Sequence, residues 1–246
     1  MVGPTASLSI LQRADGSATY KCPATGYSIL SAVNGPVELP ARRDALKPED
    51  ATVEVFVKPG TTTGGVGERA IETTLKSVLG DIVLGREKGF PRRGVVLTLN
   101  IVGGENVERG DSYLTLLPAL LHAGLLAMIS ASIPLSMTLS AVLLGVTTSG
   151  EIVQNPSPAA AKSAVSLHVL AISSKDHLLL NESRGRFDFD TWELIRARAL
   201  SICQGAANDG DVAMSEGTNT ASINAFIRET AEDQIYSAYA HKLDSI

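Results

Sequence analysis

The sequence has very few cysteines, and this scarcity limits the kinds of site that it can build. Its 246 residues include two cysteines, Cys22 and Cys203. They do not have the spacing of a metal-ligand pair, and two are too few for the disulfide framework of a small secreted domain. A chain of this length can bury a sizeable apolar core without disulfide bonds. We therefore expect a protein of a reducing compartment.

An excess of basic residues is also missing. The chain has 21 Lys and Arg residues against 26 Asp and Glu residues, which gives a formal net charge of −5. Proteins that bind nucleic acids indiscriminately are usually basic overall, so the net charge argues against this class, while RNA contact through a local basic patch remains open. The N-terminus also lacks a basic stretch followed by apolar residues, so we predict no signal peptide.

Residues 112–135 carry no formal charge and are mostly apolar. A membrane-spanning helix needs about 20 such residues. This stretch contains Pro118, His122 and Gly124, and no cluster of Lys or Arg flanks it. We therefore expect a buried core helix and no association with a membrane.

The spacing of apolar residues predicts a mixture of strands and helices. Strands are expected at 17–22, 28–39, 51–58, 94–102, 139–146, 152–153, 164–173 and 177–181. Helices are expected at 68–84, 111–130 and 191–204. Asp190 and Glu193 form a capping box for the last helix, which we expect Trp192 to anchor in the core. Because strands and helices do not alternate strictly, the predicted class is α+β, with helices packed on mixed sheets.

The C-terminal part of the chain has a different character. Residues 206–221 are rich in Asn, Asp, Gly, Ser and Thr, which predicts a flexible linker. Residues 222–246 have apolar side chains at helical spacing, which predicts an amphipathic helix. Two docking sites for this helix are open, its own domain or a neighbouring protein.

Five short motifs occur in an order that resembles the RNase PH-like proteins. They are Arg13-Ala-Asp-Gly-Ser17, the run SAVNGPVE at 31–38, Glu68-Arg-Ala-Ile-Glu72, Pro91-Arg92 and His122-Ala-Gly124. The G-P-x-E run, with Arg42 and Arg43 behind it, is similar to RNase PH-like subunits of the eukaryotic RNA exosome ring. The resemblance implies an RNase PH-like domain over residues 11–205, preceded by an N-terminal extension at 1–10.

This resemblance also implies an assembly. The chain would be one of six RNase PH-like subunits, paired as heterodimers in a ring, together with RNA-binding cap subunits and a separate catalytic exoribonuclease. Its expected function is that of a non-catalytic structural subunit, which helps to form the channel that guides RNA 3′ ends to that nuclease for RNA processing and decay. The expected localisation is nucleus, nucleolus and cytoplasm.

Active relatives hold phosphate with two arginines, and the resemblance places Arg69 and Arg109 at these positions. A planar guanidinium suits the task because it can bind two phosphate oxygens at once. Each arginine has an alternative interpretation. Arg69 lies three residues before Glu72 and could form a helical ion pair. Arg109 lies between Glu108 and Asp111, whose charges would repel an anion.

Active relatives also have carboxylates that protonate the leaving oxygen and hold Mg²⁺. At these positions the chain has amide, methyl and hydroxyl side chains, namely Gln154 or Asn155, Ala159, Ala160 and Ser166. Between Glu151 and Asp176 there is no Asp or Glu. We therefore predict no catalytic residue, no metal site, no cofactor and no enzymatic activity. The alternative is a 3′→5′ phosphorolytic exoribonuclease, alone or through a site shared with its dimer partner.

Further arginines are candidates for RNA contact. Arg42 and Arg43 fall on a loop that lines the channel mouth in similar ring proteins, where they would contact RNA phosphates. The alternative interpretation is a pair of surface arginines that contact only solvent. Arg92 and Arg93 start a predicted strand, where a charge that protects a sheet edge is an equal interpretation.

The other singled-out residues have structural interpretations. Arg184 and Arg186 flank Gly185 in what we expect to be a solvated turn. His122 and His168 lie among apolar residues and are expected in the core rather than as ligands.

Overall fold

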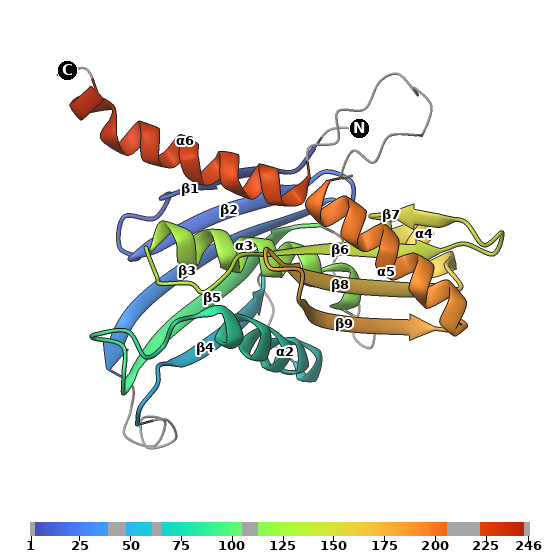
Figure 1. Ribbon diagram of the computed structural model, residues 1–246, viewed down its shortest axis with the longest axis horizontal. Helices are drawn as coiled ribbons and strands as arrows, with labels where there is room; N and C mark the ends of the chain where they lie inside the picture. The colour runs from blue at the N-terminus through green and yellow to red at the C-terminus, as the bar shows by residue number, and fades with distance from the viewer. Residues whose placement is uncertain (1–2, 39–47, 61–64, 105–112, 206–221, 244–246) are drawn as a thin grey trace.

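The computed structural model describes residues 3–38, 48–60, 65–104, 113–205 and 222–243. Two β-sheets lie on either side of a central helix (Figure 1). A second helix lies beside the central one on the first sheet, and another covers the outer face of the second sheet. The predicted α+β class with mixed sheets is therefore confirmed. Arg42, Arg43 and Arg109 lie outside the described residues, as does the predicted linker at 206–221.

The first sheet has the strand order β1-β2-β3-β5-β4. Its strands are β1 (Thr5–Leu8), β2 (Gly16–Cys22), β3 (Tyr27–Glu38), β4 (Thr52–Pro59) and β5 (Arg93–Gly103). All neighbours are antiparallel except β4 and β5, which are parallel and joined by α2 (Val66–Ile82). A parallel pair requires such a crossover. The alternating Val53, Val55 and Val57 are buried, as their spacing predicts.

The second sheet has the order β7-β6-β8-β9, and all its pairs are antiparallel. Its strands are β6 (Leu139–Val146), β7 (Ile152–Gln154), β8 (Ser166–Ser173) and β9 (Leu178–Gly185). The short helix α4 (Pro158–Ser163) lies between β7 and β8, and α5 (Phe189–Gln204) packs on β6 and β8.

The central helix is α3 (Leu117–Ser130), which packs on β2 and β3 of the first sheet and on β6 of the second. Every residue from 117 to 128 is buried. Gly124 permits this close packing, because an added Cβ would lie 3.1 Å from the Leu97 side chain and 3.3 Å from that of Leu79. The expected buried core helix is confirmed. Within the described residues, no helix is long and apolar enough to span a membrane.

The predicted C-terminal helix is α6 (Ile223–Leu243). Its first turns dock on the chain's own core, where Ile227 is buried and the Phe226 ring meets Tyr20 edge-on with centroids 6.4 Å apart. Figure 1 shows the rest of α6 continuing past β1 and β2. Ile235 and Tyr236 on this part are exposed. The own-domain alternative therefore holds for the start of the helix.

The structure corrects two expectations near the chain's N-terminus and in the second sheet. Within the predicted extension at 1–10, β1 forms the edge strand of the first sheet, with Thr5 opposite Lys21. Strand β9 continues to Gly185, so Arg184 lies in a strand rather than in a turn. Strand β1 has only four residues and none of them is buried, so the sequence shows no alternation of apolar residues there. For this reason its pairing with β2 was not predicted.

Helix α5 also differs from its prediction. It starts at Phe189 with Asp188 at the N-cap, and no side chain forms the cap, so the capping box at Asp190 is wrong. Trp192 is only half-buried, while Ile195, Ala199 and Cys203 form the buried face of the helix. Trp192 is therefore not the core anchor.

Candidate functional site

Arg69 lies in the first turn of α2, with its side chain exposed. Its neighbour Glu68 is buried, and one Glu68 carboxylate oxygen accepts a hydrogen bond from the Gly65 backbone N–H at 2.6 Å. Glu72 accepts a hydrogen bond from the Val57 backbone N–H at 2.8 Å, so its carboxylate binds to strand β4. The head of α2 therefore carries the exposed Arg69 and, at Glu68, a buried carboxylate that already caps the helix.

Tyr113 connects this helix head to the segment that precedes α3. It begins the 3₁₀ turn η1 (Tyr113–Thr115), and its hydroxyl donates a short hydrogen bond to Glu68. Burial, together with the hydrogen bond and the charge of Glu68, raises the pKa of Tyr113 to about 12, so the phenol stays protonated. Gly67 is required here, because an added Cβ would lie 2.5 Å from the Tyr113 ring.

The turn η1 also packs against β8 of the second sheet. The turn η1 therefore contacts three elements that are far apart in the sequence, namely α2, α3 and β8. No sequence motif indicated the Glu68–Tyr113 contact, because the two residues are 45 positions apart and belong to different elements. The negative charge of Glu68, the residue next to Arg69 in the chain, opposes the binding of an anion at this helix head.

The segment between β7 and β8 contains the positions where active relatives have carboxylates. Its polar groups form local backbone contacts. Asn155 has φ 46° and its N–H donates to the Leu143 carbonyl at 2.8 Å. The Ser157 hydroxyl caps α4 by accepting from the Ala160 N–H at 3.3 Å. In the described part of the chain, no group of three His, Cys, Asp or Glu side chains could hold a metal ion.

Ser166, at the start of β8, belongs to a row of polar side chains. His168 Nε2 lies 2.9 Å from the Ser166 hydroxyl, and His168 Nδ1 lies 2.8 Å from the Ser183 hydroxyl on β9. The Ser183 hydroxyl in turn donates to the Asn181 side chain at 3.3 Å. Ser166 and His168 are buried, and burial lowers the pKa of His168. The prediction that His168 is a core residue is therefore confirmed.

The arginines at the start of β5 lie away from Arg69. Arg92 and Arg93 are exposed, and Arg93 pairs with Glu38 in the sheet. Strands β4 and β5 are parallel, so Arg92 and Arg93 lie beside the start of β4. The chain reaches α2 and Arg69 only after the end of β4. The eight residues of β4 therefore separate the two arginines from Arg69 by about 25 Å. Moreover, β5 lies between β3 and β4, so the interpretation of these arginines as sheet-edge charges is wrong.

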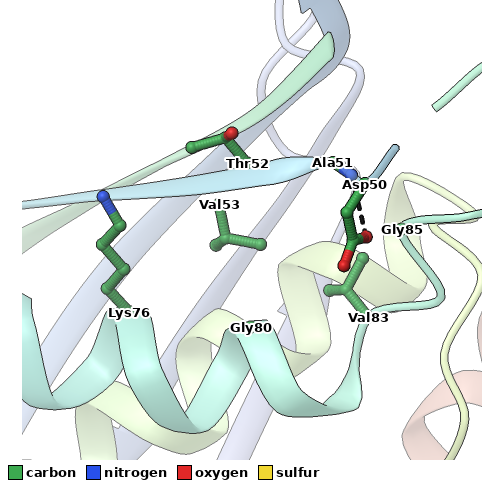
Figure 2. A pocket seen from close by; sticks show the side chains of 8 residues that line it. All are labelled: Asp50, Ala51, Thr52, Val53, Lys76, Gly80, Val83 and Gly85. Carbon is green, nitrogen blue, oxygen red and sulfur yellow. Dashed lines mark hydrogen bonds between the residues drawn. The ribbon is translucent and has the colours of Figure 1, made fainter. Parts of the chain in front are cut away.

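A pocket lies at the other end of α2, against the start of β4 (Figure 2). Gly80 and Gly85 form part of its wall. Its charged groups already have partners, since Asp50 accepts from the Ala51 N–H at 2.9 Å and Lys76 pairs with Glu54 at 2.9 Å. Gly80 is 11 residues along the helix from Arg69, which is about 16 Å. The pocket is therefore separate from the candidate site.

Comparison with known proteins gives a consistent result. No family model matches the chain. The rice (Oryza sativa subsp. japonica) protein "Exosome complex exonuclease RRP46 homolog" is 35% identical over 144 residues, which is 58% of this chain and 54% of that protein. The alignment thus spans about half the length of this curated relative.

Solved structures extend the similarity over nearly the whole chain. The crystal structure of rice Rrp46 matches with a TM-score of 0.75 and 25% identity, covering 93% of this chain and 94% of that one. An Archaeoglobus fulgidus exosome with RNA bound to the active site matches with a TM-score of 0.63 and 13% identity, over 80% and 84% of the two chains. An archaeal exosome core matches at 0.61 and 12%, over 80% and 82%. The archaeal matches show the fold, and the predicted RNase PH-like resemblance is confirmed.

Proposed function

We propose that the chain is an Rrp46-like member of the RNase PH-like exosome proteins and that it serves as a non-catalytic structural subunit of the exosome core ring. In this role it pairs with another RNase PH-like subunit and helps to form the channel that guides RNA 3′ ends to a separate exoribonuclease. RNA-binding cap subunits complete the proposed assembly. Nucleus, nucleolus and cytoplasm are the proposed compartments.

The observation that carries this proposal is the lack of carboxylates in the segment that leads into β8. Phosphorolysis requires phosphate to attack the terminal phosphodiester while an acid protonates the leaving 3′-oxygen. Ala159 and Ala160 have no proton to give, and the Ser166 hydroxyl is buried against His168. A serine hydroxyl is also a poor general acid near neutral pH, and neither side-chain type is a Mg²⁺ ligand of the usual carboxylate kind.

The first test is a direct assay of the full chain. Labelled single-stranded RNA is incubated with the protein, inorganic phosphate and Mg²⁺, with an active RNase PH as the positive control. We expect no release of nucleoside diphosphates above the protein-free background. Release that depends on added phosphate would contradict the non-catalytic role.

The second test concerns assembly. A stable ring subunit should co-purify with another RNase PH-like exosome chain and bury an interface of the obligate kind, typically 2,000 Å² or more. Size-exclusion chromatography with light scattering measures the complex directly. A chain that stays monomeric beside every RNase PH-like exosome subunit would remove the structural role.

An alternative function is a contribution to a phosphorolytic site shared with the dimer partner. Two observations favour testing it: Arg69 is exposed at the head of α2, and the rice relative is named an exonuclease. In this alternative the partner supplies the acid and this chain supplies the phosphate-binding guanidinium. Arg69→Ala should then lower the activity of the heterodimer, while Arg228→Ala on α6 should not. Equal activity of both variants would exclude the shared site.

A further inference from the structure

Three aromatic residues lie within six positions of the sequence where β9 leads into α5. Phe189 and Trp192 stack with their ring centroids 6.0 Å apart and their planes 28° from parallel. The Phe187 and His168 rings form a T-shaped pair, with their centroids 4.6 Å apart and their planes at 78°. Phe189 is 73% exposed and Phe187 is 41% exposed. We call these three residues the aromatic patch.

The aromatic patch is unusual for this chain. Phe, Trp and Tyr make up 4% of the sequence, yet three such residues fall within six positions. Aromatic rings contribute most to stability when they are buried, so two exposed phenylalanines beside a half-buried tryptophan add little to the fold. Their exposure instead offers flat apolar surface to a ligand.

Basic side chains lie next to the aromatic patch. Arg186 is exposed, and its backbone N–H donates to the Val165 carbonyl at 3.3 Å, which places it beside the chain that enters β8. Lys162 is exposed three residues before Val165, in the last turn of α4. Arg196 is exposed one helical turn after Trp192. In the described ranges, no ion pair involves any of these three cations.

The distribution of acidic residues favours a polyanionic ligand on one side of the patch. From residue 152 to residue 175 there is no Asp or Glu, so no carboxylate of the α4–β8 segment opposes a phosphate near Lys162 or Arg186. Asp188 and Asp190 lie at the start of α5, where the positive end of the helix dipole stabilises them. Phosphates should therefore approach from the α4 side, and the exposed ring faces remain for the bases.

We propose that the aromatic patch binds single-stranded RNA, with bases stacked on Phe189 and Trp192 and backbone phosphates held by Arg186 and Lys162. Exposed aromatic rings beside arginines are typical of surfaces that bind single strands without sequence preference, because every base has a flat face. A protein ligand would need acidic side chains opposite these cations, whereas every RNA nucleotide brings a negatively charged phosphate together with a base. This inference rests on the proposed function, because RNA is the substrate of the proposed exosome ring.

Trp192 is the single tryptophan of the chain, so its fluorescence reports on this surface alone. The full chain is titrated with a 12-nucleotide oligoadenylate at low salt, and separately with inorganic polyphosphate of similar charge. Base stacking should quench the emission with the oligonucleotide, whereas polyphosphate should not. Absence of quenching, or equal quenching by polyphosphate, would overturn the proposal.

Matched substitutions locate the contact. Phe189→Ala retains the reporter and should weaken oligoadenylate binding about fivefold or more, as expected for loss of one stacked base. Leu194→Ala, which removes another exposed apolar side chain from α5, should leave the affinity unchanged. Arg186→Ala should weaken binding and reduce its salt dependence, whereas Arg228→Ala should do neither.

The outcomes separate this inference from the proposed function. If Phe189→Ala leaves RNA affinity intact but prevents co-purification with a RNase PH-like partner, the surface is a protein interface and the inference fails while the ring role stands. If the wild-type chain never joins a ring but Trp192 is still quenched by oligoadenylate, the proposed function fails and the RNA surface stands.

Discussion

His122 and His168 are both buried, but their ring nitrogens have different kinds of partner. His122 lies between the two sheets, where its Nε2 accepts from the Ala141 backbone N–H at 2.9 Å and its Nδ1 faces the Tyr20 hydroxyl at 3.1 Å. His168 lies at the end of the second sheet between the hydroxyls of Ser166 and Ser183. A backbone N–H can only donate, whereas a hydroxyl can donate or accept.

This difference determines which of the two histidines can change its tautomer or protonation state. The Ala141 N–H requires an unprotonated Nε2, so His122 has one allowed tautomer, with the proton on Nδ1. The hydroxyls around His168 can rotate to suit either tautomer or the imidazolium. The centre of the molecule is therefore chemically fixed, while the end of the second sheet, next to the aromatic patch, can adapt.

The largest effect is expected from His122→Phe. The ring shape is nearly conserved, but the Ala141 N–H and the Tyr20 hydroxyl both lose their buried partner. Each unsatisfied group costs about 1–3 kcal/mol, so the free energy of unfolding should fall by about 3–4 kcal/mol. Urea unfolding monitored by circular dichroism measures it.

The matched control for this prediction is His177→Phe, which makes the same change at an exposed histidine. This variant should unfold at nearly the same urea concentration as the wild type. If the two variants were equally stable, the backbone contact of His122 would not be the reason for its burial.

The second prediction concerns pH and follows from the same contact. Burial lowers the pKa of His122 to about 4 from its ordinary value of 6.5. Between these values the unfolded chain binds a proton that the folded chain does not, so stability falls as the pH drops through this range. The contribution of His122 to the loss between pH 7.5 and pH 4.5 should be about 2–3 kcal/mol.

Paired unfolding curves of the wild type and His122→Phe test this slope. The stability difference between them should shrink at pH 4.5, because the variant has no group to protonate at this position. A difference that stays constant from pH 7.5 to pH 4.5 would show that His122 is not the titrating group.

The sequence predicted the elements whose side chains alternate clearly between core and surface. Val53, Val55 and Val57 identify β4, and the charge-free run around His122 identifies α3. The sequence analysis was wrong where contacts between residues far apart in the chain determine the structure. Strand β1 exists because it pairs with β2, and Trp192 is only half-buried because Ile195 and Ala199 already fill the interface with the sheet.

Some features of the candidate site could be predicted from the sequence, and others depend on contacts between distant residues. The lack of carboxylates between Glu151 and Asp176 is a property of the sequence itself and needs no coordinates. The Glu68–Tyr113 contact, in contrast, depends on the packing of η1 against α2, and no local pattern encodes it. Likewise, the parallel pairing of β4 and β5 separates Arg92 from Arg69, which their positions in the sequence do not reveal.

The smallest effect is expected from Ser166→Ala, at the adaptable end of the second sheet. This change removes one hydroxyl from His168 but leaves Ser183 on the other ring nitrogen. The loss should be about 1 kcal/mol, the typical net value of one hydrogen bond. The contribution of His122 to the pH dependence between 7.5 and 4.5 should stay that of the wild type, because its contacts with Ala141 and Tyr20 are unchanged. A loss as large as that of His122→Phe would mean that the hydroxyls around His168 are as fixed as the backbone N–H of Ala141.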